Sequence, residues 1–186
     1  MKNLFRKYTG ILSLLSFLLI LPIHFAHSQN IDELFGIKLL DNATNYVPSD
    51  YIENNKYKNL ETISGFWGLN ITSKVSSPYF DIFSITIDDF NVIHMIHGKK
   101  IYPTKDRCLD FLNTLTEKVE TKKQIKFTFE EQDYGDQILF KYQVFVNNLS
   151  IGILCGHEFD PIKNRMSYYI RSVELIDAVN MYYDQD

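Results

Sequence analysis

The two cysteines, Cys108 and Cys155, have the greatest chemical potential in the chain. Thiolates are nucleophiles and metal ligands, whereas a pair of thiols forms a disulfide in an oxidising compartment. Cys155 is followed by Gly156, His157 and Glu158, so a thiol, an imidazole and a carboxylate lie within four residues. The partners of a cysteine nucleophile usually come from distant segments, however, and a disulfide removes the nucleophile. We therefore expect a structural disulfide between Cys108 and Cys155. The alternatives are two separate buried thiols, or an exposed reactive thiol such as a thiol enzyme or redox protein would use.

Paired histidines and clustered aspartates also have the chemistry to bind a metal ion. His94 and His97 lie three residues apart on a predicted strand, where such neighbours point to opposite faces of a sheet. The acidic segments 88–89 and 133–136 carry hard oxygen ligands but lack the spacing of a calcium-binding loop. We expect ordinary strand histidines and acidic turns here, and we assign no metal ligand, cofactor-binding residue or catalytic residue.

The single tryptophan, Trp67, lies in a short segment between Gly65 and Gly68. An exposed tryptophan would serve as an aromatic contact for a partner or a glycan. A buried anchor at a bend before the sheet is the interpretation that we favour.

Asn42, Asn70 and Asn148 each begin an Asn-X-Ser/Thr sequon. Such motifs also arise by chance in an asparagine-rich chain, and they are glycosylated only if the source is eukaryotic. The sequence therefore does not decide whether these asparagines are glycosylated.

The first 28 residues are predicted to be a cleavable secretory signal peptide. Three basic residues precede an apolar run of 11 residues, Ile11–Leu21, which is interrupted only by Ser13 and Ser16. This length is typical of the hydrophobic region of a signal peptide and is too short for an ordinary membrane-spanning helix. An uncleaved N-terminal anchor is the alternative.

The predicted cleavage site lies between Ser28 and Gln29. Ala26 and Ser28 place small residues three positions and one position before the cut, as signal cleavage requires. We expect 1–28 to be the signal peptide and 29–186 to be a single α+β domain, with no stable membrane span after cleavage. The predicted location is the periplasm or the exterior of the cell.

The charge of the chain restricts its partners. Three of the 19 basic residues and none of the 23 acidic residues lie in 1–28, which leaves a net charge of −7 on 29–186. An acidic protein repels phosphate backbones and anionic membrane surfaces. We expect no nucleic-acid partner.

The elements expected in the N-terminal part are short. Segment 34–39 is predicted to be extended, with a bend at Gly36. Asp41 is expected to cap a short helix that runs through Tyr46 and ends before Pro48. The polar segment 49–61 is predicted to be a surface loop.

The rest of the chain alternates hydrophobic and polar residues with the period of strands, interrupted by one amphipathic helix. The expected strands are 81–88, 92–97, 125–130, 137–146, 150–155 and 165–173, and the expected helices are 104–120 and 174–183. The predicted fold is α+β: a curled antiparallel sheet with one main helix packed on one face, short N- and C-terminal helices and one disulfide. Cys108 lies on the apolar stripe of that helix, and Cys155 shares a strand face with Ile151 and Ile153.

Several segments of the chain together resemble a known group of proteins. These are 34–39, 61–66, 92–98 and the pair Cys108 and Cys155. They are similar to segments of small exported proteins of AT-rich marine alphaproteobacteria. The resemblance implies a periplasmic location and no catalytic residue. A looser likeness, to small envelope modules that begin with a glycine-bearing strand, lacks the Gly-Met-Thr type of start.

Together, these features predict a non-enzymatic binding or interaction domain of the periplasm or cell envelope. Its partner would be a protein or an envelope component. One alternative is an envelope enzyme or thiol-redox protein that uses Cys108 or Cys155. The other is a small-ligand carrier, which requires a sizeable apolar pocket.

Overall fold

The computed structural model describes residues 31–58, 65–159 and 162–183. Most of the described chain forms one large antiparallel sheet. Its strands are β3 (Lys56–Tyr57), β4 (Phe66–Asn70), β5 (Ile82–Asp88), β6 (Ile93–Tyr102), β7 (Thr128–Asp133), β8 (Gln137–Val146), β9 (Leu149–Phe159) and β10 (Ile162–Ser172). They lie in the order β3-β4-β5-β6-β10-β9-β8-β7, so the sheet is open, with β3 and β7 at its edges.

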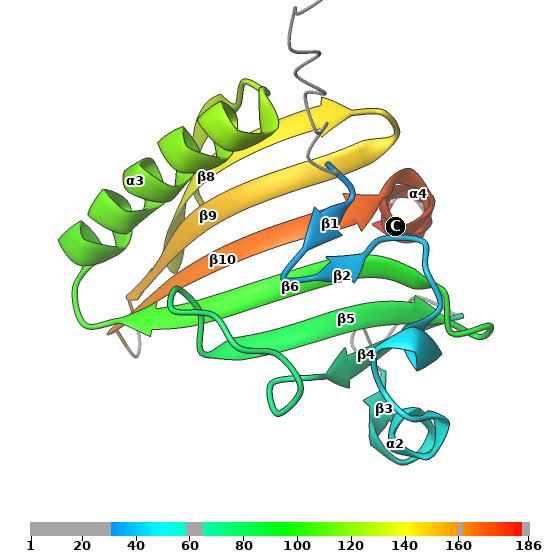
Figure 1. Ribbon diagram of the computed structural model, residues 1–186. Coiled ribbons are helices and arrows are strands. Elements are labelled where there is room, and N and C mark those ends of the chain that lie inside the picture. The colour runs from blue at the N-terminus through cyan, green and yellow to red at the C-terminus, as the bar shows by residue number, and fades with distance from the viewer. Residues whose placement is uncertain (1–30, 59–64, 160–161, 184–186) are drawn as a thin grey trace, which may run out of the picture.

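Short strands and helices complete the described structure. They are β1 (Glu33–Leu34), β2 (Ile37–Lys38), the 3-10 helix η1 (Ala43–Asn45), α2 (Ser49–Asn55), α3 (Lys105–Lys123) and α4 (Val173–Tyr183). Figure 1 shows α3 and the β1–β2 hairpin over the same face of the sheet. The predicted α+β class and antiparallel sheet are confirmed. Among the described helices, none has the length and apolar composition needed to cross a bilayer.

The helix α3 has clear signals at both of its ends. The Thr104 side chain accepts a hydrogen bond from the backbone N–H of Arg107, at 3.3 Å, and so caps the first turn. Gln124 ends the helix in the left-handed conformation, with a φ of 54°. The helix buries one side against the sheet, mainly β9 and β10, through Cys108, Leu112, Leu115, Thr116 and Val119. The helix predicted at 104–120 is confirmed and extends to Lys123.

A disulfide joins Cys108 on α3 to Cys155 on β9, as the sequence predicts. Their Cα atoms lie 6.0 Å apart, and both residues are fully buried. On β9, Ile151 and Ile153 are buried on the same face as Cys155, which is the face that α3 covers. The described residues include no free cysteine.

The β1–β2 hairpin corrects the prediction of one bent strand over 34–39. Phe35 and Gly36 both have positive φ, 58° and 79°, and form a two-residue turn. The chain therefore reverses here, and Leu34 pairs with Ile37. The twist of such a turn matches that of the flanking strands, which favours a hairpin over an extended bend.

The hairpin is anchored on the sheet by the ring of Phe35. This ring packs edge-on against Phe80, Phe83 and Tyr168, at centroid distances of 5.5, 4.9 and 6.3 Å. Beneath it lies Gly98 of β6, where an added Cβ would come within 2.5 Å of Phe35 Cζ. Phe35 lies this close to the sheet because residue 98 has no side chain.

The predicted cap of the first short helix is wrong by one residue. Asn42 caps η1 through its side-chain oxygen, which accepts a hydrogen bond from Thr44 N at 3.0 Å. Asp41 instead accepts hydrogen bonds from the Tyr46 hydroxyl and from Asn42 N, both at 2.8 Å. These bonds, the Tyr46 hydroxyl first, lower the pKa of Asp41 below its usual value.

The surface loop predicted at 49–61 is also wrong over its first part, because Ser49–Asn55 forms α2. Pro48 precedes this helix at its N-cap position, where the missing N–H costs no hydrogen bond. Ile52 is the fully buried contact of α2 with the core. Residues 59–64 lie outside the described residues.

The other predicted strands and the C-terminal helix occur with shifted ends, whereas strands β3 and β4 were not predicted. The strand predicted at 125–130 begins later, at Thr128, and the strand predicted at 150–155 extends from Leu149 to Phe159. The turn at Asn147 and Asn148 has positive φ at both residues, as a tight hairpin requires.

Removing the disulfide is expected to destabilise the protein strongly. In the chain-entropy model, opening a loop with a sequence separation of 47 costs about 4 kcal/mol. A Cys108→Ser/Cys155→Ser double variant should therefore unfold at a much lower urea concentration than the oxidised protein. Reduction of the wild type should reproduce the loss, and an unchanged urea midpoint in both cases would contradict it.

Gly98→Ala is expected to displace the β1–β2 hairpin and to cost about 1–3 kcal/mol, the usual penalty for overpacking. Urea denaturation of Gly98→Ala, Phe35→Ala and the double variant tests this contact. Because Phe35→Ala removes the ring that the new methyl group meets, Gly98→Ala should cost clearly less in that background. Additive losses would show that the two residues are energetically independent.

Candidate functional site

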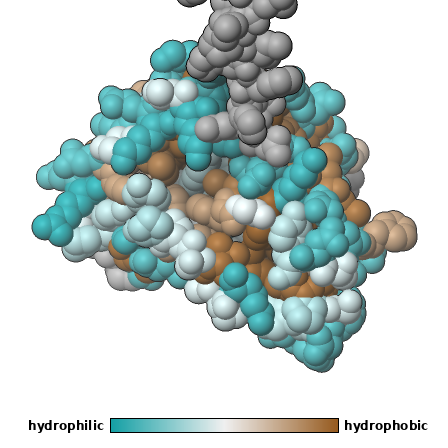
Figure 2. All heavy atoms as spheres, in the orientation of Figure 1, coloured by the Kyte–Doolittle hydropathy of each residue, from teal (hydrophilic) through white to brown (hydrophobic). Residues whose placement is uncertain are grey.

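A groove lies between α3 and the β1–β2 hairpin on the face of the sheet that both elements cover. It has a volume of about 670 Å³, and the loop at 76–79 contributes to its wall. Figure 2 shows apolar side chains in a hollow among hydrophilic residues on this face. The volume lies within the range of small-molecule binding sites in proteins.

The walls and floor of the groove are mainly apolar. Leu34 and Phe35 come from the hairpin, Leu115 and Val119 from α3, and Tyr168 from β10. Leu115 and Val119 lie four residues apart, so they share one side of the helix. Both are buried, with 7% of each residue exposed.

Tyr168 gives the floor of the groove a polar group. Its side chain is buried, with 4% exposed, and its ring packs beside those of Phe35 and Phe80. Among the described residues, the buried side-chain polar atoms that lack a hydrogen-bond partner are Thr86 Oγ1 and Arg171 Nε, and the Tyr168 hydroxyl is not one of them. Burial raises the pKa of Tyr168 above its usual value, so the hydroxyl stays protonated and is available as a donor.

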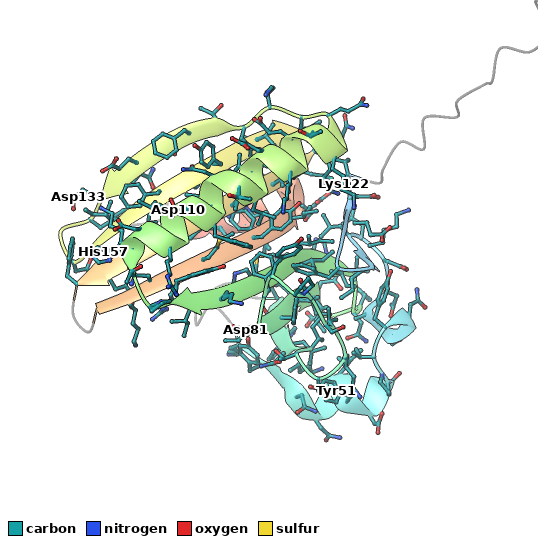
Figure 3. The ribbon with its side chains drawn as sticks, turned by 60° about the vertical axis from the view of Figure 1, so that its left-hand side comes forward. Tyr51, Asp81, Asp110, Lys122, Asp133 and His157 are labelled. Atoms are coloured by element: carbon teal, nitrogen blue, oxygen red, sulfur yellow. A yellow bond between two sulfur atoms is a disulfide. The ribbon has the colours of Figure 1, made fainter. Side chains whose placement is uncertain are left out.

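The α3 side of the groove is basic. Lys118, Lys122 and Lys123 line it, and Lys118 and Lys122 are exposed. Tyr79 also lines the groove, and Lys118 Nζ lies 5.5 Å from the centroid of its ring. In Figure 3, Lys122 lies at the end of α3 near the β1–β2 hairpin.

Lys123 links the two walls of the groove. Its Nζ donates a hydrogen bond to the carbonyl oxygen of Glu33 in β1, at 3.0 Å. Burial, and then the neighbouring charge of Lys122, lowers the pKa of Lys123 from its usual value. An additional negative charge in the groove would oppose this shift.

The groove was not predicted from the sequence. The stripe Leu115, Lys118, Val119 and Lys122 has helical spacing and combines apolar with basic residues, which was the available signal. The stripe indicates an amphipathic helix edge, but it does not show what lies opposite. The hairpin that forms the other wall is more than 70 residues away in sequence and had been predicted as one extended strand.

The structure separates the residues of the Cys155–Glu158 segment that could have formed a thiol site. Cys155 is bonded to Cys108, and His157 Nδ1 lies 2.8 Å from the side-chain oxygen of Asn164. Glu158 instead forms an ion pair with Arg165 at 2.9 Å. In Figure 3, His157 lies at the end of the sheet remote from Lys122. These residues are therefore not part of the groove.

His94 and His97 lie on β6 beside an irregularity in its pairing with β5. The ladder shifts at His94, because Thr86 pairs with Met95 and Ile87 with Ile93. His94 Nε2 lies 3.3 Å from Asp88 Oδ2, whereas His97 Nδ1 lies 3.5 Å from Ser84 Oγ. The two histidines therefore contact different residues of β5.

The two histidines still have separate partners. His94 Nδ1 lies 2.9 Å from Ser172 Oγ, and His94 packs edge-on against Phe66. Within the part of the chain that the structure describes, no three His, Cys, Asp or Glu side chains gather as a metal site would require.

The acidic segments form turns, as expected. Asp88 Oδ1 accepts hydrogen bonds from Phe90 N and Val92 N, and Asp133 Oδ1 accepts one from Gly135 N. These carboxylates therefore stabilise the backbone of their own turns.

Trp67 is partly buried, and its Nε1 donates a hydrogen bond of 2.8 Å to Asp89 Oδ1. Lys56 Nζ lies 5.5 Å from the centroid of its ring. Trp67 is therefore a half-buried residue of strand β4, paired with Ile87 of β5, and not a buried anchor at a bend before the sheet as predicted.

The predicted cleavage residues, Ser28 and Gln29, lie outside the described residues. Of the sequon asparagines, Asn42 is engaged in the η1 cap, and its side-chain N–H donates to Phe90 O at 3.1 Å. A glycan on Asn42 would compete with these contacts.

Burial, followed by the charge of Lys99, lowers the pKa of His97 from 6.5 to about 4. As the pH falls from 6.5 towards 4, His97 therefore becomes protonated in the unfolded chain but stays neutral in the folded chain. Stability should fall over this window, by up to about 3 kcal/mol. A His97→Gln variant should show a shallower pH dependence in urea denaturation, whereas equal slopes would contradict the shift.

No family model, curated protein or solved structure matches this chain. We therefore interpret the groove from the chemistry of its own side chains.

Proposed function

We propose that this chain is an exported, non-enzymatic binding domain that works in the periplasm or outside the cell, and that it binds an envelope component in the groove beside α3. The observation that carries the proposal is the groove itself. Its volume of about 670 Å³ and its apolar lining provide the sizeable apolar pocket that binding of a small ligand requires.

The disulfide supports a binding role over thiol chemistry. A thiol enzyme or redox protein needs a cysteine that forms a thiolate and meets its substrate. Cys108 and Cys155 are bonded to each other and fully buried, so neither sulfur has a thiolate or access to solvent. Both cysteines instead serve to hold α3 on the sheet.

Two features of the chain support export. The predicted signal peptide, 1–28, ends in a sequence typical of signal cleavage. A buried disulfide between residues far apart in sequence is also typical of proteins that fold in oxidising compartments. The intact mass of the protein recovered from the producing cells should correspond to a chain that begins at Gln29, with the disulfide formed.

The binding role is tested with Nile red, an uncharged dye that fluoresces in apolar surroundings. The mature wild-type protein should bind it, and Ser76→Trp should weaken binding, because Ser76 lines the groove. An indole there should remove enough apolar contact to lower the affinity roughly tenfold, the equivalent of about 1.4 kcal/mol. The readout is a fluorescence titration.

The matched control is Ser73→Trp, which places the same side chain on an exposed residue of the same loop, outside the groove. It should leave the Nile red titration unchanged. Failure of the wild type to bind the dye, or equal binding by both tryptophan variants, would reject the groove as the binding site.

A further inference from the structure

The α3 side of the groove has a charge opposite to that of the protein as a whole. Residues 29–186 carry a net charge of −7, yet three lysines line this side. Among the described lining residues, Glu33 alone carries a carboxylate. Two exposed ammonium groups, those of Lys118 and Lys122, therefore lie beside an apolar floor and favour a ligand with negative charge.

The lysines do not surround a pocket suited to a small hydrophilic anion. Lys118 and Lys122 alternate along α3 with Leu115 and Val119, so charge and apolar surface follow the same side of the helix. A ligand that meets both must itself be amphipathic. Its apolar part would cover Leu115 and Val119, while its charged end would remain near the exposed ammonium groups.

Tyr168 adds a polar group to this mainly apolar floor. Burial raises the pKa of its hydroxyl, so the group stays protonated. A protonated hydroxyl can donate one hydrogen bond, and an oxygen atom of a ligand in the groove would accept it.

We propose that the groove binds a single-chain amphiphile with an anionic head group, whose chain lies on Leu115 and Val119 and whose head is held by Lys118 and Lys122 with a hydrogen bond from Tyr168. This inference rests on the proposed binding function and specifies its ligand class. A head group such as a carboxylate offers both the charge and the acceptor oxygens that these residues require.

The test compares three ligands with the same chain and different heads: tetradecanoate, tetradecanol and tetradecyltrimethylammonium. Each displaces Nile red from the mature protein, at concentrations below its micelle threshold. Tetradecanoate should bind roughly tenfold more tightly than tetradecanol, since charge-assisted hydrogen bonds exceed neutral ones. The cationic amphiphile should bind most weakly.

The role of the lysines is tested with Lys118→Ala/Lys122→Ala. This variant should bind tetradecanoate no better than tetradecanol, with its affinity for tetradecanol unchanged. The control is Lys58→Ala/Lys126→Ala, which removes the same charge from two exposed lysines outside the groove. It should keep the preference for the anion.

The role of Tyr168 is tested with Tyr168→Phe, which removes only the hydroxyl. Affinity for tetradecanoate should fall roughly fivefold, the loss of a single hydrogen bond to a ligand. Because Phe keeps the buried ring of Tyr168, the thermal midpoint should be unchanged. A lowered midpoint with unchanged affinity would show that the hydroxyl is structural and would remove it from the proposed site.

The outcomes separate this inference from the binding function on which it rests. Equal affinity for all three ligands, or a preference for the cation, overturns the anionic head group but leaves the groove as a binding site. Displacement of Nile red by none of the three overturns the amphiphile as the ligand class, while the dye site in the groove stands. Nile red binding that is insensitive to Ser76→Trp rejects both proposals.

Discussion

The covalent attachment of α3 to β9 determines how the main face of the sheet is covered. A helix that packs on a sheet can shift along it, because hydrophobic contacts have no direction. The bond between Cys108 and Cys155 removes that freedom near the first turn of α3 and places the rest of the helix over β9 and β10. Its second half, with Leu115 and Val119, then lies where the hairpin approaches.

The groove forms because α3 and the β1–β2 hairpin lie on the same face of the sheet but are anchored to it at separate points. The hairpin is held by Phe35, which packs on Gly98 and against three further aromatic rings. The helix is held by the disulfide and its apolar stripe. Between them, the hydrogen bond from Lys123 to Glu33 joins the walls, and Tyr168 forms part of the floor. The apolar floor of the groove stays partly open because neither α3 nor the β1–β2 hairpin covers the whole face of the sheet.

Local patterns were sufficient to predict most of the sheet, and they failed where the chain turns or is irregular. The alternation in 137–146 predicted β8 with its observed ends, and Thr104 predicted the start of α3. The reversal at Gly36 was missed, because a bend and a tight turn use the same residue types. The bulge at His94 was also missed, because the extra residue is defined by the partner strand and not by β6 itself.

The sequence by itself determined the sites of the main helix and of the long strands, and it paired Cys108 with Cys155, because hydrophobic period and capping are properties of neighbouring residues. Only the tertiary structure decided that Leu115, Lys118 and Val119 face a hairpin, and that Tyr168 lines the space between them. The physical reason is that the groove is formed by elements far apart in the chain, whose surfaces meet at the Lys123–Glu33 hydrogen bond and leave a space beside it. Hydrophobic periodicity indicates which side chains must be buried, whereas a space that remains open depends on the positions of elements far apart in the chain.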